Sequence, residues 1–123
     1  MLKSEDLRQF TGTTQWFAIG APFPDVIFTE GVEYLAREGQ AQWLVVAIAA
    51  HLTTKPAFRL DHMLFWKLTK GENDSAVLTA VRDTGLPPCV RQVIPWTDFP
   101  LQEVEIWSSF NGEVWTLYLP SEH

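Results

Sequence analysis

The spacing of apolar residues changes from helical to strand-like near the middle of the chain. Between Thr29 and Leu52 apolar residues recur three or four positions apart, whereas after Pro56 they tend to recur at every second position. Helices that precede a run of adjacent strands are typical of α+β domains. We therefore predict an α+β fold in which N-terminal helices pack on one face of a four- to five-stranded antiparallel meander sheet.

The first half of the chain is predicted to contain two main helices. One is expected to follow the capping residue Thr29 and to end at Gly39. Gly31 in its first turn costs up to about 1 kcal/mol relative to alanine, so it marks either a bend at the helix start or a point of close packing. The other helix, AQWLVVAIAAHL from Ala41 to Leu52, is apolar nearly all round, which is typical of a helix at the centre of a core. A short helix is also expected near Ser4.

Strands are predicted on both sides of these helices. Met63 to Thr69, Ala76 to Asp83 and Val90 to Trp96 are separated by the turn sequences GENDS and TGLPP. Before the helices, the segment from Thr11 to Ile27 is rich in glycine and proline. It is predicted to be an irregular connection with one strand over Gln15 to Ile19.

The last two strands are predicted to form a hairpin around Asn111-Gly112, which is the strongest short signal for a two-residue turn. Such a turn sets the register, so that Trp107 faces Thr116 and Glu105 faces Tyr118. One face of this hairpin is then apolar, and the outward residues are Glu105, Trp107, Ser109, Thr116 and Tyr118. Trp107 is therefore an aromatic residue on a mainly polar face.

Length and charge limit the classes of function. At 123 residues the chain is predicted to be a single domain over residues 1–123. Fifteen acidic and nine basic residues give a formal charge of −6. The sequence contains no run of Lys or Arg that could follow a phosphate backbone. We therefore expect no direct binding of nucleic acid. An acidic surface can attract a basic partner or imitate nucleic acid, although solubility alone also explains it.

The chain is expected to be cytoplasmic and to bind no membrane. The longest apolar run, Trp43 to Ala50, is less than half of a membrane span, and acidic residues interrupt the N-terminal segment where a signal peptide needs an apolar stretch. Cys89 is the only cysteine, which excludes an internal disulfide and a multi-cysteine zinc site and fits a reducing compartment.

Candidate chemistry is sparse. His51, Asp61 and His62 come nearest to a metal or acid/base cluster, but no HxxxH, HxH or HxxE spacing places them on one face. The alternative for His51 is a helix C-terminal residue that interacts favourably with the helix dipole. Glu103 and Glu105 are spaced as paired carboxylates can be, yet they also fit a solvated strand face. We predict no cofactor, no bound metal and no catalytic residue.

Aromatic residues suggest a recognition surface instead. Of six tryptophans, Trp43, Trp66 and Trp115 are expected in the core. Trp107 is expected on the outer face, and exposed Trp and Tyr residues often anchor protein interfaces. The predicted partner-binding residues are Trp107, Tyr118, Glu105, Trp96, Asp98 and Phe99, the last three within a connector from Pro95 to Pro100. Alternatively, a loop, the N-terminal segment or a second copy of the chain covers this face.

Several short segments of the chain, taken together, are distinctive. They are FTGT with QWF (residues 10–17), FTEGVEYLA (28–36), AxWL with His51 (41–51), FWKLT (65–69), IPWTDFPL (94–101) and LYLPSEH (117–123). Together they resemble a family of small bacterial proteins classified only as a domain of unknown function. The resemblance implies a standalone cytoplasmic bacterial protein and a link to phages or other mobile elements, but no activity, cofactor or catalytic residue.

The sequence thus favours a small interaction module, an inhibitor or accessory factor of a mobile element, that binds a protein partner through an acidic and aromatic sheet face. One alternative is a small metal-dependent or acid/base enzyme that uses His51, Asp61 and His62. Another is a homodimer joined through the same sheet face. The interaction module is preferred because the chain has a candidate aromatic patch but no tight catalytic spacing.

Overall fold

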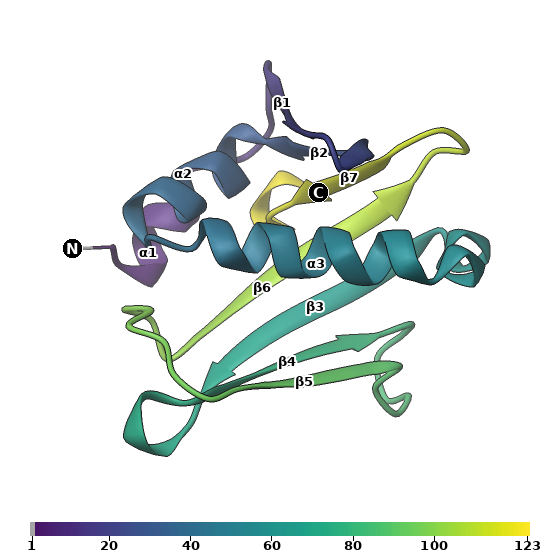
Figure 1. Ribbon diagram of the computed structural model, residues 1–123. Helices are drawn as coiled ribbons and strands as arrows, with labels where there is room; N and C mark the ends of the chain where they lie inside the picture. The colour runs from purple at the N-terminus through teal and green to yellow at the C-terminus, as the bar shows by residue number, and fades with distance from the viewer. Residues whose placement is uncertain (1) are drawn as a thin grey trace.

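The computed structural model describes residues 2–123 and contains a mixed sheet beside several helices, which confirms the α+β class (Figure 1). The helices are α1 (Ser4–Leu7), α2 (Glu30–Glu38) and α3 (Gln42–Thr54), with 3₁₀ turns η1 (Pro56–Asp61), η2 (Glu72–Asp74) and η3 (Pro120–Glu122). The strands are β1 (Trp16–Gly20), β2 (Phe23–Thr29), β3 (Met63–Lys70), β4 (Ala76–Val81), β5 (Val90–Ile94), β6 (Glu103–Phe110) and β7 (Trp115–Tyr118).

The sheet is not the predicted four- to five-stranded antiparallel meander. Its seven strands lie in the order β1-β2-β7-β6-β3-β4-β5, and β2 runs parallel to β7. Strands β3, β4 and β5 follow one another as neighbours, but β6 returns to the free side of β3. The resulting order β6-β3-β4-β5 is that of a Greek key. The stretch from Pro95 to Gln102 forms the return connection.

The sequence prediction missed β2. Pro22 and Pro24 made this segment read as an irregular connection, since proline cannot donate to a strand ladder. In the structure, the β1–β2 ladder is irregular between Ala18 and Gly20, and Pro24 is not among its paired residues. Proline is tolerated at such an irregularity, so the strand forms despite both prolines.

The β6–β7 hairpin forms with a different register from the predicted one. Trp107 pairs with Tyr118 instead of Thr116. The connecting loop runs from Asn111 to Val114, and the Asn111 side-chain oxygen accepts two backbone N–H bonds of 2.9 Å that close it. Because the register differs by two residues and side chains alternate with a period of two, each residue keeps its predicted face.

The core lies between α3 and one face of the sheet, where α3 runs across β3 and β6 (Figure 1). The predicted boundaries of α2 and α3 agree with the structure within a few residues. Trp66 and Trp115 are buried as expected, and Trp43 is partly buried against the core. Trp66 Nε1 donates a 3.0 Å hydrogen bond to Ser108 Oγ. Within residues 2–123, no helix is both long and apolar enough to cross a membrane.

Two glutamates anchor distant segments at the N-terminus of α2. Glu30 Oε1 accepts hydrogen bonds from the Thr14 hydroxyl (2.8 Å) and from the amides of Thr14 (3.0 Å) and Gln15 (2.9 Å). The bond from the Thr14 hydroxyl is the main cause that lowers the pKa of the Glu30 carboxyl, with further backbone bonds acting in the same direction. Glu30 therefore ties the segment before β1 to the first turn of α2.

The second carboxylate, Glu122, ties the end of the chain to the same turn. Glu122 Oε1 accepts from the Thr29 hydroxyl (2.7 Å) and the Leu119 amide (2.9 Å), and Oε2 accepts from the Gly31 amide (3.2 Å). A Cβ atom added at Gly31 would lie 2.6 Å from Glu122 Oε1. Of the two alternatives for Gly31, the structure therefore shows a point of close packing.

The contribution of Glu30 to stability is expected to depend on pH. Its folded-state pKa is lowered, so the charged carboxylate stabilises the folded state above the unfolded pKa, and this stabilisation is lost as the pH falls through the folded value. Glu30→Gln should therefore melt below wild type at neutral pH, and the two curves should converge below about pH 4. Thermal melts across this range test the expectation, with the exposed Glu113→Gln as control. A difference that stays constant with pH would contradict it.

Candidate functional site

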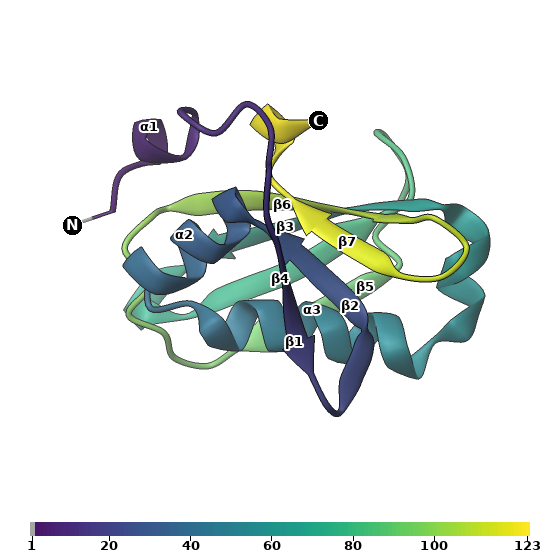
Figure 2. The same ribbon diagram turned by 90° about the horizontal axis from the view of Figure 1, so that it is seen from above.

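The sheet has one face that α3 does not cover. Figure 2 shows α3 on one side of the sheet and α1 with η3 on the other. On this second side, which we call the open face, the side chains alternate with those that point into the core. Its residues on β3 and β6 are Met63, Phe65, Lys67, Thr69, Glu103, Glu105, Trp107 and Ser109.

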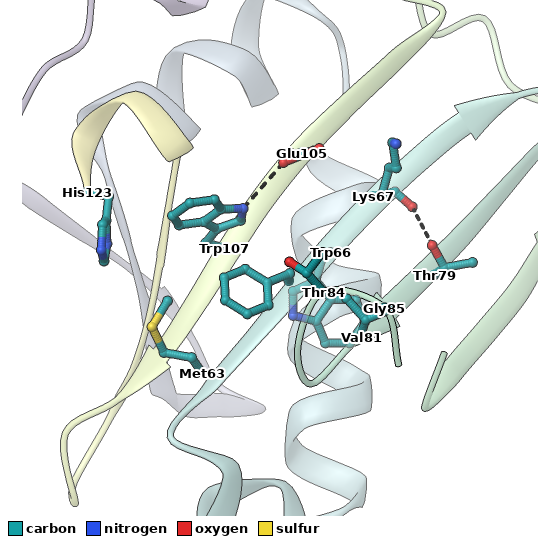
Figure 3. Close-up of a pocket in the computed structure, with 11 residues that line it drawn as sticks. Met63, Trp66, Lys67, Thr79, Val81, Thr84, Gly85, Glu105, Trp107 and His123 are labelled. Carbon is teal, nitrogen blue, oxygen red and sulfur yellow. Dashed lines mark hydrogen bonds between the residues drawn. The ribbon is translucent and has the colours of Figure 1, made fainter. Parts of the chain in front are cut away.

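A groove of about 610 Å³ lies on the open face. We call it the Trp107 groove. Figure 3 shows Trp107 and Met63 on one side of it, with Thr84 and Gly85 of the β4–β5 loop facing them. The residues that line it are Met63, Phe65, Trp66, Lys67, Thr79, Val81, Thr84, Gly85, Glu105, Trp107 and His123. The groove thus has an aromatic and aliphatic floor and a polar rim.

Trp107 is half-buried and packs edge-to-face with three other rings. Its ring centroid lies 5.1 Å from that of Phe65, 5.2 Å from that of His123 and 6.2 Å from that of Tyr118, with interplanar angles of 90°, 70° and 80°. Trp107 Nε1 donates a 3.4 Å hydrogen bond to Glu105 Oε2 (Figure 3). These contacts hold the indole in one orientation while part of its surface remains open to solvent.

Tyr118 does not line the groove but contacts residues that do. It is 9% exposed, and burial raises the pKa of its phenol. Its ring stacks on that of His123 at 5.8 Å and 11°, and its hydroxyl lies 3.1 Å from His123 Nδ1. The hydroxyl also makes a weak 3.9 Å hydrogen bond to Met63 Sδ. Tyr118 therefore positions two residues of the groove wall and presents little surface of its own.

The two glutamates on β6 differ in their surroundings. Glu103 forms a 3.5 Å salt bridge with Lys67 on the neighbouring strand. Glu105 is exposed and, within residues 2–123, forms no salt bridge; its carboxylate accepts the hydrogen bond from Trp107. Glu103, near the groove, is therefore held in a salt bridge, whereas Glu105, which lines the groove, is in none within the described residues.

A second hollow continues the open face towards β1. It encloses about 480 Å³ and shares Met63 and His123 with the Trp107 groove. On its far side lies Trp16, which is 56% exposed. The open face is therefore hollowed on both sides of the His123 ring.

The structure separates the predicted partner-binding residues into two groups. Glu105 and Trp107 line the groove, and Tyr118 contacts Trp107 without lining it. Trp96 is 65% exposed but does not line the groove. Asp98 is exposed and borders a small hollow beside Gly39, away from the groove lining.

Phe99 was placed wrongly by the sequence prediction. It is 2% exposed and belongs to the core, so it is not an exposed edge of a binding surface. Lys70 explains its position, because Lys70 Nζ donates to the carbonyl oxygens of Thr97 (3.3 Å) and Phe99 (3.0 Å). These bonds hold the connection against the sheet, and the Phe99 ring packs into the core.

The alternative metal or acid/base cluster is not assembled. His51 Nε2 lies 2.7 Å from Gln92 Oε1, and its ring packs over Trp66 on the core side of the sheet. Asp61 accepts hydrogen bonds of 3.1 and 3.2 Å from Arg82, while His62 is exposed. Among the side chains of residues 2–123, no group of three or more His, Cys, Asp or Glu could hold a metal ion.

Sequence reasoning overlooked several residues of the groove. Phe65 and Met63 alternate with the core residues of β3, so the same period-two pattern that placed Trp107 outward would have placed them beside it. His123 and the β4–β5 loop residues carry no comparable signal, because their positions depend on contacts between distant parts of the chain.

Comparisons with known proteins give a family but no characterised relative. No curated protein and no solved structure matches the chain. The model of a family of unknown function, DUF6876, matches residues 1–123. This match agrees with the resemblance seen in the FTGT, FTEGVEYLA, IPWTDFPL and LYLPSEH segments. The chain therefore belongs to DUF6876, a family of unknown function.

Proposed function

We propose that this protein is a small interaction module that binds a protein partner through the open face of its sheet. The observation that carries the proposal is the half-buried Trp107, fixed by three rings and a hydrogen bond at the edge of a groove. A preoriented aromatic side chain loses little conformational entropy on binding, and Trp is enriched at the energetic centres of protein interfaces.

The shape of the open face favours a macromolecular partner over a small molecule. Small-molecule sites enclose most of their ligand and direct a few buried polar groups at it. Here two hollows lie side by side across the sheet, and the polar groups at the rim, such as Glu105 and Lys67, are solvent-accessible. A partner that spans both hollows would cover Trp16 and Trp107 together.

The resemblance of the chain extends the proposal to its biological setting. It suggests a cytoplasmic bacterial protein that acts as an inhibitor or accessory factor of a phage or other mobile element. The net charge of −6 supports a basic partner surface over another acidic one.

Trp107→Ala is expected to abolish capture of the partner from a lysate of the native host. The matched control is Trp96→Ala, which removes the same kind of side chain from an exposed position outside the groove. The partner retained by wild type is identified, purified and titrated against both variants. We expect affinity to fall by at least about 30-fold, or roughly 2 kcal/mol, for Trp107→Ala, and to stay within about twofold for Trp96→Ala.

Circular dichroism of both variants shows whether the fold is kept. Full affinity of a folded Trp107→Ala variant would reject the proposed site. Equal loss of the partner in both variants would show that binding is not specific to the groove. Light scattering of the protein alone tests the remaining alternative, in which a second copy occupies the open face.

A further inference from the structure

We propose that the partner presents a basic segment and that one of its arginine side chains binds in the Trp107 groove, with its guanidinium against the aromatic rings and Glu105. This inference rests on the proposed function, since it names the chemistry of the partner at the same face. It is carried by the charge and ring geometry of the groove.

Charge is unevenly distributed around the groove. Lys67 lies directly opposite Glu105 in the sheet register, yet its ammonium pairs at 3.5 Å with Glu103, two positions earlier on β6. Glu105 is left with a hydrogen bond from a neutral indole and no salt bridge among residues 2–123. A cation that enters the groove therefore meets a carboxylate that forms no salt bridge within the described residues.

Two aromatic rings adjoin the Glu105 carboxylate. Phe65 and Trp107 meet at an interplanar angle of 90° with centroids 5.1 Å apart, so the two rings form adjoining walls of a corner. Glu105 Oε2 accepts from the indole Nε1 at 3.4 Å, which places its carboxylate at the rim of the Trp107 ring. Cations bind favourably over aromatic faces, and Trp is the best of them.

These two features together match arginine better than lysine. A guanidinium is planar and stacks on an aromatic ring while its N–H groups bond a carboxylate at the ring's edge. Arginine is also less strongly hydrated than lysine, so a half-open groove removes its water at a lower cost. The methylenes of the arginine side chain would contact Met63 and Val81, which line the same groove.

The charge of the whole chain points to a basic segment rather than to a second copy. Each copy carries a formal charge of −6, so two open faces that approach one another repel, whereas a basic segment is attracted. Two residues that can carry a positive charge also line the groove. Lys67 is engaged by Glu103, and His123 Nδ1 lies 3.1 Å from the Tyr118 hydroxyl.

The test uses two short peptides that differ at one position. Both are acetylated, amidated and otherwise glycine and serine, and the central residue is arginine in one and its neutral isostere citrulline in the other. Binding is followed by the indole N–H resonance of Trp107 in nitrogen-15 spectra, identified from its absence in Trp107→Phe. The arginine peptide is expected to bind on the order of fivefold more tightly than the citrulline peptide.

Glu105→Gln supplies the second arm. This substitution should lower the affinity for the arginine peptide by about three- to tenfold and leave the affinity for the citrulline peptide unchanged. Glu113→Gln, which makes the same change of net charge in the exposed hairpin loop, should affect neither peptide. Equal binding of the two peptides, insensitivity to Glu105→Gln, or no shift of Trp107 at about 10 mM arginine peptide would overturn the inference.

The same variants separate this inference from the proposed function. If the purified partner needs Trp107 but binds Glu105→Gln as tightly as wild type, the open face is an interface and the arginine assignment is wrong. If the partner binds Trp107→Ala at full strength, the proposed function itself is wrong.

Discussion

Replacing Phe99 with alanine is expected to lower the free energy of unfolding by about 3–4 kcal/mol. The ring is 2% exposed and lies within the core, so its removal loses buried apolar area and leaves a cavity. The Greek-key return connection is also attached through this residue, because Lys70 Nζ donates to its carbonyl oxygen at 3.0 Å. Phe99→Ala keeps this backbone bond, so the expected loss comes from the core packing of the ring.

Trp96→Ala is the matched control for this change. Trp96 lies in the same connection, three positions earlier, but is 65% exposed. Its replacement is expected to change the free energy of unfolding by no more than about 0.5 kcal/mol. Urea denaturation of both variants measures the contrast. Similar losses of stability for the two variants would show that the connection does not pack as described.

Gly31→Ala is the second change with a large expected effect. In an ordinary helix interior, alanine is favoured over glycine by about 1 kcal/mol. Here the added Cβ would lie 2.6 Å from Glu122 Oε1 and 2.7 Å from Leu119 Cδ1. Glu122 would have to leave the donors of Thr29, Gly31 and Leu119, and the net loss of stability is expected to be about 2 kcal/mol.

Gly12→Ala is the control for the glycine substitution. A Cβ at Gly12 would meet nothing within 4 Å, and this residue is not among the glycines with positive φ. Its replacement is expected to be neutral or to stabilise the protein by up to about 1 kcal/mol through the unfolded state. The double variant Gly31→Ala, Glu122→Gln should lose less stability than the sum of the single changes, because both disrupt one network. Strict additivity would argue against the network.

Features of the fold that depend on local pattern could be predicted from the sequence. The capping residue Thr29 and the closing Gly39 bracket α2, and the near-continuous apolar run marks α3. In the hairpin, the alternation of β6 and β7 is a property of each strand, so the faces were right even though the turn at Asn111 is longer than predicted.

Features that depend on pairing between distant segments could not be predicted. Strand β6 lies beside β3 because the Pro95–Gln102 connection folds back across the sheet. The contact between Lys70 and Phe99 that holds this connection joins residues far apart in the sequence, so no local pattern indicates it. The strand β2 was not predicted because it contains Pro24. The strand accommodates this proline because its pairing with β1 is irregular. For Gly31 the sequence left two alternatives open, and contacts with Glu122 at the other end of the chain distinguish them.

The candidate site shows the same division. Trp107 and Glu105 were placed on one outward face by alternation alone, and the structure brings them together at the groove. Trp96 and Phe99 do not extend this surface as predicted. The course of the connection leaves Trp96 exposed outside the groove and Phe99 in the core. The contribution of His123 arises from stacking with Tyr118, which no spacing rule indicates.

The most direct test of the proposed function is a map of methyl chemical-shift changes when the purified partner is added. If the partner binds the open face, the methyl groups of Met63 and Val81 in the Trp107 groove should shift or broaden. The methyl groups of Val46 on α3 and Leu60 in η1, both exposed but outside the groove lining, should remain unchanged. Changes confined to Val46 and Leu60, with Met63 and Val81 unaffected, would contradict the proposal.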